Sequence, residues 1–394
     1  MSAVLPLSVQ PNRILSLGDV VTINPKIDRA SLSDETLVSF VSMAAVGAGN
    51  GKIDASTAKP YSEVKKGYTN FQDGDVLFAK VTPCMENGKM AVAHGLKNGV
   101  GFGSTEFHVL RPGKAVDSRY VYYFISGASY LKVAARHMTG AVGLRRVPAD
   151  FLAKTQLPVP SLVEQRRVVA EIEKQFSRLD QAIASLRRAK ANIKRYEKAT
   201  VQDLTRAAIN LPATVGTIGD IAISLDNQRR PVNKNERAKR PGEIPYLGAN
   251  GQTGVIDKPL FDEELVLVVE DETFVGRTAP FSYYFAGKCW VNNHTHVLRA
   301  RREVVLPKYL NLALSYYPFI PLTTGSTGRR KLTKAALMAA SISVPTLLQQ
   351  QEIVAEIDRR MSIARGVEAQ VDANLKRAQA LRQAVLTKAF SAQP

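Results

Sequence analysis

The most regular pattern in the chain is a set of apolar residues spaced three and four apart within residues 161–210. This spacing places the apolar side chains on one stripe of an α-helix. The stripe consists of Val169, Ile172, Phe176, Leu179, Ile183, Leu186, Ile193 and Leu204. A second stripe, within residues 346–394, consists of Val354, Ile357, Met361, Ala364, Val371, Leu375, Ala378, Val385 and Ala389. Each run follows a Val-Pro pair, with Ser161 or Thr346 as the candidate N-cap. We therefore predict two long helices.

The length of the first stripe, five heptads, is typical of a coiled coil. The alternative is an amphipathic helix that lies on its own domain. A polar surface on the remaining faces, and the absence of glycine and proline from residues 161–210, favour the coiled coil.

Two charged residues interrupt the stripes, and they predict how the helices pair. Lys190 and Glu368 occupy apolar positions of the first and second helix. An antiparallel pair with Ile172 beside Val385 places Lys190 beside Glu368. A parallel pair would place both charges against apolar side chains, which is unfavourable. We predict an antiparallel coiled coil.

This arrangement predicts a globular domain at each end of a rod. At about 1.5 Å per residue, a coil of roughly 35–45 residues spans about 50–65 Å. Two proteins that read adjacent major grooves need centres about 34 Å apart. The rod therefore has the right order of length to hold two groove readers.

The chain also repeats itself. Residues 139–173 and 324–358 align without a gap at a shift of 185, with 13 identities in 35 positions. Further upstream, residues 108–111 (HVLR) match residues 296–299, and residues 17–20 (LGDV) resemble residues 218–221 (IGDI). Such self-similarity indicates two copies of one structural plan. We predict four parts: recognition domain 1 (1–160), a spacer helix (161–210), recognition domain 2 (211–345) and a second spacer helix (346–394).

Both globular parts have the pattern of strand-rich α+β domains. Residues 75–81, 90–93, 264–269 and 290–299 are rich in β-branched and aromatic residues and predict strands. An Asn87-Gly88 turn is predicted to join the first two. Residues 119–135 and 307–317 predict short helices.

The chain is basic, with 53 Lys and Arg against 35 Asp and Glu and a net charge of +18. The excess is spread over the whole chain, so it does not come from a basic tail. A globular protein that is basic throughout is typical of one that binds a polyanion, such as nucleic acid. A protein that is merely basic is the alternative. Two cysteines, no signal peptide and no long apolar run predict a cytoplasmic protein without disulfides or a membrane span.

Several motifs resemble the specificity subunits of type I restriction-modification systems. In the first half they are GDVLFAKVTPCMENGKMAV (74–92), FGSTEFHVLRP (102–112) and TGAVGLRRVPADFL (139–152). In the second half they are IPYLGANGQTGVID (244–257), CWVNNHTHVLRA (289–300) and TGSTGRRKLTKAAL (324–337). The helix entries LPVPSLVEQRRVVAEIE and ISVPTLLQQQEIVAEID resemble the paired spacers of that family. One departure is Gln349-Gln350-Gln351, where the first entry has Glu164-Gln165-Arg166.

The resemblance implies a non-catalytic, DNA-binding subunit. Each recognition domain would read one half of an asymmetric, bipartite double-stranded DNA target. The spacer helices would dock two methyltransferase (M) subunits, and restriction (R) subunits would join the complex. S-adenosylmethionine would bind in the methyltransferase partner, with no cofactor in this chain.

The candidate DNA contacts are basic side chains beside flexible turns. The two Thr-Gly loops rank first because a basic cluster recurs at the same place in both halves, although a solvated turn is the alternative. They contribute Arg145, Arg146, Ser326, Thr327, Arg329, Arg330 and Lys331. The basic segment 228–240 adds Arg229, Arg230, Lys234 and Lys239, with Arg237 and Arg240 nearby. Weaker candidates are Lys80, Lys89 and Arg277.

Three other functions have little support in the sequence. The chain has no P-loop and no Asn/Asp-Pro-Pro-aromatic methyltransferase motif. A nuclease could be assembled only from Asp54, Glu63 and Lys65, which are common residues at loose spacing. A coiled-coil scaffold without a DNA role is the third alternative.

Cys289, His294 and His296 are close in sequence, as metal ligands often are. A fourth ligand is not evident, and His296 has a repeat mate in His108. We therefore predict hydrogen-bonded structural histidines on one strand face and no metal site.

Overall fold

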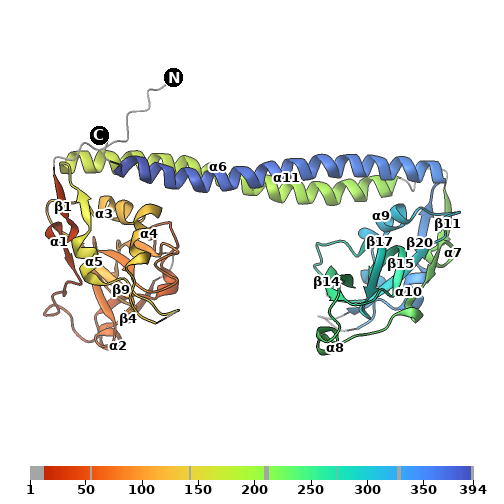
Figure 1. The fold of residues 1–394 in the computed structure, drawn as a ribbon, viewed down its shortest axis with the longest axis horizontal. Helices are drawn as coiled ribbons and strands as arrows, with labels where there is room; N and C mark the ends of the chain where they lie inside the picture. The colour runs from red at the N-terminus through yellow and green to blue at the C-terminus, as the bar shows by residue number, and fades with distance from the viewer. Residues whose placement is uncertain are drawn as a thin grey trace, which may run out of the picture. The chain divides into compact units, whose positions relative to one another are not determined.

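The computed structural model describes residues 13–53, 56–141, 143–207, 213–272, 274–325 and 330–391. The chain divides into two compact units, which we describe separately. Unit 1 comprises Met1–Ser185 and Asn374–Pro394, and unit 2 comprises Leu186–Ala373. Two long helices, α6 (Leu162–Ala207) and α11 (Leu347–Phe390), contribute to both units (Figure 1). None of the helices described is both long enough and apolar enough to span a membrane.

Unit 1 is a mixed α+β domain. Its strands are β1 (Ile14–Ser16), β2 (Val21–Ile23), β3 (Leu37–Val41), β4 (Thr57–Pro60), β5 (Thr69–Gln72), β6 (Val76–Ala79), β7 (Met90–Val92), β8 (Val100–Gly103), β9 (Phe107–Pro112) and β10 (Gln156–Pro158). Its short helices are α1 (Leu17–Val20), α2 (Tyr61–Val64), α3 (Ser118–Ile125), α4 (Ala128–Arg136) and α5 (Ala149–Lys154). Among these residues, the strands form the sheets β2-β9-β6-β7, β4-β3-β8-β5 and β1-β10.

Unit 2 is also a mixed α+β domain. Its strands are β11 (Thr214–Thr217), β12 (Ala222–Ser224), β13 (Ile244–Gly248), β14 (Gly251–Ile256), β15 (Phe261–Val269), β16 (Asp271–Glu272), β17 (Ser282–Val291), β18 (Thr295–Ala300), β19 (Arg330–Lys331) and β20 (Ser341–Val344). Its short helices are α7 (Ile218–Ile221), α8 (Lys234–Ala238), α9 (Pro307–Ser315) and α10 (Lys334–Ala339). The main sheet has the order β12-β18-β15-β17-β13-β14, and α9 packs on its strands β15 and β17 (Figure 1).

The central strand of each unit contains a continuous apolar run, because it is buried on both faces along β6 and along residues 265–269 of β15. In β6, Val76 and Phe78 face the core beneath α3, whereas Leu77 belongs to a second core on the opposite face. In β15, Val266 faces the core beneath α9 and Leu267 faces the other side. Successive side chains of a strand alternate between its faces, so one strand serves two cores.

A buried glutamine fixes the start of each long helix against its domain. The side chain of Gln165 is fully buried. Its Oε1 accepts a hydrogen bond from the amide of Asp117 at 2.9 Å, and its Nε2 donates to the carbonyls of Ala115 and Pro160. In unit 2 the fully buried Gln350 makes the same three bonds, with Leu306, Val304 and Pro345. The joint between each domain and its long helix is therefore made by the same three hydrogen bonds in both units.

The long helices pair in antiparallel fashion in both units, as predicted. In unit 2, Lys190 Nζ lies 2.7 Å from Asp372 Oδ1 and 3.8 Å from Glu368 Oε1. Lys194, one turn further along α6, contacts Glu368, one turn earlier in α11. In unit 1, Arg382 stacks over the ring of Phe176 at 4.2 Å. Lys190 therefore lies beside Glu368, as predicted, and also contacts Asp372, because a side chain on one paired helix can contact more than one turn of the other.

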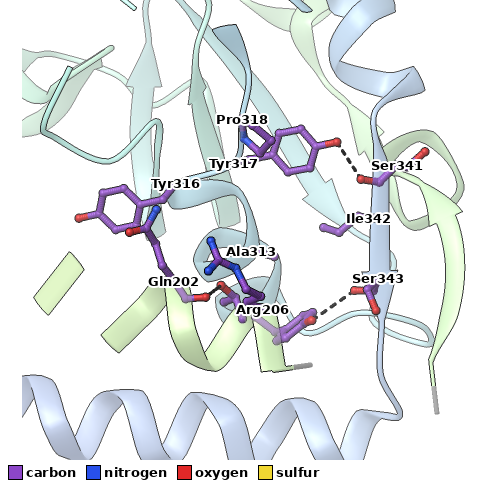
Figure 2. A pocket seen from close by; sticks show the side chains of 11 residues that line it. Gln202, Arg206, Ala313, Tyr316, Tyr317, Pro318, Ser341, Ile342 and Ser343 are labelled. Atoms are coloured by element: carbon purple, nitrogen blue, oxygen red, sulfur yellow. Dashed lines mark hydrogen bonds between the residues drawn. The ribbon is translucent and has the colours of Figure 1, made fainter. Parts of the chain in front are cut away.

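Each long helix begins in one unit and ends in the other, and the packing around its C-terminal end differs between the two units. In unit 1, the α11 residue Phe390 packs against Tyr120 and Phe124, with ring centroids 5.1 and 5.5 Å apart. The repeat places Thr205 and Ala313 at the positions of Phe390 and Phe124. A cleft of about 280 Å³ remains there, lined by Gln202, Arg206 and Tyr316 among others (Figure 2). Tyr317 and Tyr309 also line the cleft, and their hydroxyls donate to the carbonyls of Ser341 and Ser343.

Three local predictions need correction. Strands β6 and β7 pair as predicted, but residues 80–89 connect them, so the turn is longer than an Asn-Gly pair. The helix predicted over residues 119–135 is divided between α3 and α4 because Ser126 and Gly127 interrupt it. The segment 290–299 is the end of β17, a turn and most of β18, rather than one strand.

Candidate nucleic-acid interface

The base of each Thr-Gly loop is built in the same way. Thr139 and Arg146 exchange two backbone hydrogen bonds of 2.9 and 2.8 Å. Thr324 and Lys331, at the repeat shift of 185, exchange bonds of 2.9 and 2.8 Å. The glycine after each threonine has a positive φ, 120° at Gly140 and 111° at Gly325, a conformation that favours glycine. The base of each loop is therefore closed by a hydrogen-bonded pair of residues. Ser326, Thr327 and Arg329 of the second loop lie outside the described residues.

A buried histidine holds the residue that follows each loop. Nε2 of His108 lies 2.8 Å from the carbonyl oxygen of Val147, and Nε2 of His296 lies 2.8 Å from that of Leu332. The amides of Val147 and Leu332 donate in turn to the carbonyls of Lys80 and Glu270, at the ends of β6 and β15. The histidines therefore have a structural task, as predicted, and it is to anchor the loops to the central sheet.

The basic residues of the first loop are paired with carboxylates. Arg146 makes two hydrogen bonds with Glu106, of 2.8 and 2.6 Å, and the bond from Arg146 lowers the pKa of that carboxyl. Arg145 contacts Glu86 at 3.3 Å. Both arginine side chains remain about two-fifths exposed, at 42% and 41%. To contact a ligand, each arginine must either share its guanidinium group between the ligand and the carboxylate or release the carboxylate.

The second loop holds its cations differently. Arg330 donates to the hydroxyl and the carbonyl of Thr323, on the same hairpin. Lys331 Nζ lies 3.1 Å from Glu270, and its side chain is 56% exposed. The loop therefore presents Lys331 at the surface, whereas Arg330 supports the hairpin.

The segment 228–240 contains anchored and exposed cations. Arg229 is an internal residue, because its side chain is 14% exposed and bonds Glu270 at 2.5 Å and the carbonyl of Thr295 at 2.8 Å. We therefore assign it a structural role. Arg237 stacks on the ring of Tyr246 and Arg240 on that of Trp290. Exposed side chains belong to Arg230, Lys234 and Lys239.

The three weaker candidates occupy half-buried positions. Lys89 Nζ donates to the carbonyl of Met43 at 2.9 Å. Arg277 donates to Asn250 and to the carbonyl of Pro280. The charge of Lys80 acts on Glu106 and His108 and so belongs to the support of the first loop. These contacts favour supporting roles for all three.

The residues of the alternative sites are not brought together. Glu63 lies 3.6 Å from Lys59, and Lys65 lies 2.8 Å from Asp34, while Asp54 is outside the described residues. His294 is not on a strand face with His296, which corrects that prediction. It lies in the turn before β18 and contacts Asp271 at 2.6 Å, whereas His296 is buried in β18. Among the described residues, no group of three or more His, Cys, Asp or Glu is arranged to hold a metal ion.

The sequence profile of the type I restriction modification DNA specificity domain matches residues 12–195 and 211–373. The chain belongs to this family. Relatives in Escherichia coli include the specificity subunits of the type I restriction enzymes EcoEI, 40% identical over 168 residues, and EcoAI, 39% identical over 170 residues. Each match covers 42% of this chain and 28% of the relative. The StySPI specificity subunit of Salmonella potsdam is 23% identical over 71% of this chain and 66% of its own length.

Solved structures show the same fold. A chain from a study of complex assembly and conformational transition of the type I R-M system matches with a TM-score of 0.72, covering 96% of this chain and 97% of that one. The HsdS subunit from Thermoanaerobacter tengcongensis matches with a TM-score of 0.61 over 96% of both chains. Both are 20% identical to this specificity-domain protein, so the likeness concerns the fold.

Sequence reasoning missed the acidic and amide residues that organise this family member's loops. They are Asn24, Glu106, Asp226 and Glu270. The repeated HVLR segment was a signal for the histidines, but not for their partners. Asn24 and Asp226 lie 84 and 70 residues from the histidines they contact.

Proposed function

We propose that this chain is the specificity subunit of a type I restriction-modification enzyme and reads a bipartite, asymmetric DNA target. The observation that carries the proposal is the pair of Thr-Gly loops, whose bases share the two backbone hydrogen bonds of the closing pair and the bond from the residue that follows. Each loop presents basic side chains, which suit phosphate and base contacts. Two copies of one reader with different surface residues suit a target with two different halves.

The surface of the long helices supports the proposed partners. Val163 and Leu348, which are equivalent in the repeat, are 78% and 67% exposed, and Ile363 and Leu381 are also exposed. Apolar side chains repeated on two helices suit the docking of two equal partners, here two methyltransferase subunits. Restriction subunits join this assembly in the cytoplasm. S-adenosylmethionine binds in the methyltransferase subunits, and this chain contributes no catalytic residue.

Genome-wide adenine methylation tests the proposal. Cells that express the chain with its methyltransferase partner are compared with cells that lack only this chain. We expect a two-part motif with a fixed gap that appears only when the chain is present. Glu63→Ala with Lys65→Ala serves as a control and leaves the motif unchanged. Unchanged methylation without the chain, or a single uninterrupted motif, would contradict the two-reader proposal.

The exposed lysines at the start of α8 and just after its end provide a second prediction. Changing Lys234 and Lys239 to glutamine is expected to weaken binding of the chain–methyltransferase complex to duplex DNA of any sequence. The slope of log affinity against log salt should fall by about 1 for each phosphate that is no longer neutralised by a lysine, or about 2 in total. The measurement is fluorescence anisotropy over a salt series. The control, Lys376→Gln on α11, is expected to leave the slope unchanged. An equal slope in the double variant would remove these lysines from the interface, and salt-independent binding of the unmodified complex would favour a scaffold.

A further inference from the structure

We infer that Asn250, at the tip of the hairpin formed by β13 and β14, reads an adenine in one half of the target, and that Arg277 is the positioning residue that holds its amide. This inference rests on the proposed function, which it extends to a specificity-determining side chain. The tip, residues 248–254, contains no charged residue. Base edges in the major groove are neutral donors and acceptors, so an uncharged amide can read them, whereas cations suit the phosphates.

The turn of the hairpin displays Asn250 at an open position. Strands β13 and β14 pair in antiparallel fashion as far as Gly248 and Gly251, and the two residues between these glycines form the turn. Asn250 is exposed. A Cβ added at Gly251 would meet no other atom within 4 Å, and the φ of 101° at this residue favours glycine. The amide therefore has free space beside it, and a two-stranded ribbon of this kind fits the width of the major groove.

The side-chain amide of Asn250 has one defined orientation. Nη2 of Arg277 lies 2.8 Å from Oδ1 of Asn250, and a guanidinium group can only donate, so the oxygen of the amide faces Arg277. Arg277 is held in turn by the carbonyl of Pro280, to which its Nε and Nη2 donate at 3.1 and 2.8 Å. Its guanidinium group also lies 5.8 Å from the centroid of the Phe281 ring. The amide is therefore preorganised before any ligand binds.

An amide held in this way matches one base. Its Nδ2 is a donor, and its Oδ1 keeps a second acceptor site beside the one that Arg277 occupies. Within the described ranges of the chain, Nδ2 of Asn250 has no hydrogen-bond partner. Adenine alone presents an acceptor, N7, next to a donor, the N6 amino group, in the major groove, whereas guanine presents two acceptors. Asn250 can therefore bind adenine through two hydrogen bonds.

The hairpin packs against the basic segment 228–240, which the sequence predicts to contact DNA. Arg237 of α8 stacks over the ring of Tyr246 in β13 at 4.3 Å. A Cβ added at Gly254 in β14 would lie 3.3 Å from Nε of Arg237. Helix α8 therefore lies beside the hairpin (Figure 1). The exposed lysines at the start of α8 and just after its end lie within about one helical turn of Arg237.

The tip is also linked to the base of the second Thr-Gly loop. The backbone N–H of Asn292 donates to the carbonyl of Leu247 at 2.9 Å. In the same turn, His294 contacts Asp271 at 2.6 Å, and Asp271 of β16 pairs with Lys331 of β19. The side chain of Lys331 is 56% exposed. Two neighbouring elements thus supply cations for phosphates, while the tip itself supplies an uncharged amide for a base.

Unit 1 has a corresponding turn, around Asn50, that lies against its own domain. The turn follows β3, which pairs in parallel with β8 as β13 pairs with β17. Oδ1 of Asn50 accepts the backbone N–H of Lys52 at 3.0 Å. Gly51 bridges Ala91 of β7, and a Cβ at Gly51 would lie 2.6 Å from the ring of Tyr122 in α3. Because this turn packs on β7 and α3, we expect Asn50 to make no base contact.

Asn250→Asp tests the reading role with little change of shape. The carboxylate keeps an oxygen for Arg277 and removes only the donor that would bond N7 of adenine, while it can accept from the amino group of cytosine. Adenine methylation is mapped in cells that express the variant with the methyltransferase partner. We expect one A·T pair in one half of the motif to be no longer required or to be replaced by C·G. The other half and the gap should stay the same.

Binding of the chain–methyltransferase complex gives the magnitude of the effect. Four duplexes carry the four base pairs at that position, and fluorescence anisotropy measures the affinity for each. The unmodified complex should prefer adenine by at least about tenfold, within the range expected of a base contact with two hydrogen bonds. Asn250→Asp should reduce this ratio to about one or below. Arg277→Ala should lower it by about threefold or more, and Arg277→Lys, which can still donate to Oδ1, should restore part of it.

Two variants control for charge and for the repeat. Asn293→Asp adds the same charge at an exposed position of the neighbouring turn and should weaken binding to all four duplexes equally. Asn50→Asp makes the same change in the corresponding turn of unit 1 and should leave the motif as it is. The unfolding midpoint, followed through Trp290 for unit 2, verifies that the variants of that unit are folded.

The outcomes separate this inference from the proposed function. A bipartite motif that Asn250→Asp leaves unchanged, equal weakening of all four duplexes in that variant, or the same change of preference in Asn293→Asp would overturn the inference and leave the proposed function intact. Absence of a bipartite motif with the unmodified chain would overturn the proposed function and the inference with it. Loss of the adenine preference at one position of one half, in Asn250→Asp but in neither control, would support the inference.

Discussion

Gln350→Ala is expected to lower the free energy of unfolding of unit 2 by about 3–5 kcal/mol. The substitution leaves the amide of Leu306 and the carbonyls of Val304 and Pro345 without their partner. Each buried polar group that loses its hydrogen bond costs about 1–3 kcal/mol. The side chain is fully buried, so solvent cannot replace these bonds without opening the joint between α11 and its domain. Urea unfolding followed through Trp290, the only tryptophan of the chain, measures the change.

The neighbouring residue provides a matched control. Gln351 has the same side chain on the same turn of α11 but is exposed. Gln351→Ala is therefore expected to change the stability by less than about 0.5 kcal/mol. Equal effects of the two substitutions would show that helix propensity rather than the buried hydrogen bonds explains the result. Gln165→Ala should destabilise unit 1 by a similar amount, because Gln165 makes the same three bonds.

The parts of the fold that the sequence predicted are those with local or repeated signals. The two long helices follow from the spacing of apolar residues, and their antiparallel pairing follows from the two charges that interrupt the stripes. The central strand of each unit was visible because burial on both faces leaves a continuous apolar run. The repeat at a constant shift predicted that the bases of both Thr-Gly loops would be built in the same way.

The remaining features depend on contacts between residues far apart in the sequence. Arg229 was a candidate for DNA contact because it lies in a basic segment. Its burial follows from Glu270, 41 residues away, which no local pattern reveals. The contact of His296 with Asp226, 70 residues away, likewise has no local signal. The repeat concealed this difference, because the same histidine stands beside an amide in one unit and a carboxylate in the other.

The far ends of the long helices lead to the second large prediction. Phe390→Ala is expected to destabilise unit 1 by about 2–4 kcal/mol, somewhat below a fully buried phenylalanine because the ring is half-buried. The ring contacts Tyr120 and Phe124 of α3, so its loss should loosen that helix first. Hydrogen exchange of the amides of α3 should become about tenfold faster for each 1.4 kcal/mol of destabilisation. Unchanged exchange in α3 would show that α11 does not hold this part of the domain.

The repeat provides both the control and the reverse experiment. Thr205 takes the place of Phe390 in unit 2, where its hydroxyl bonds the carbonyl of Val201 in its own helix and a cleft adjoins it. Thr205→Ala should therefore change the exchange of α9 by less than about tenfold, since about 1 kcal/mol or less is at stake. Thr205→Phe should place a ring in the space beside Ala313 and slow the exchange of α9, by a stabilisation of about 0.5–2 kcal/mol. Faster exchange in that variant would mean that Tyr316 and Tyr317 cannot move to accommodate the ring. The surroundings of the two helix ends would then differ in rigidity as well as in how completely side chains fill the space.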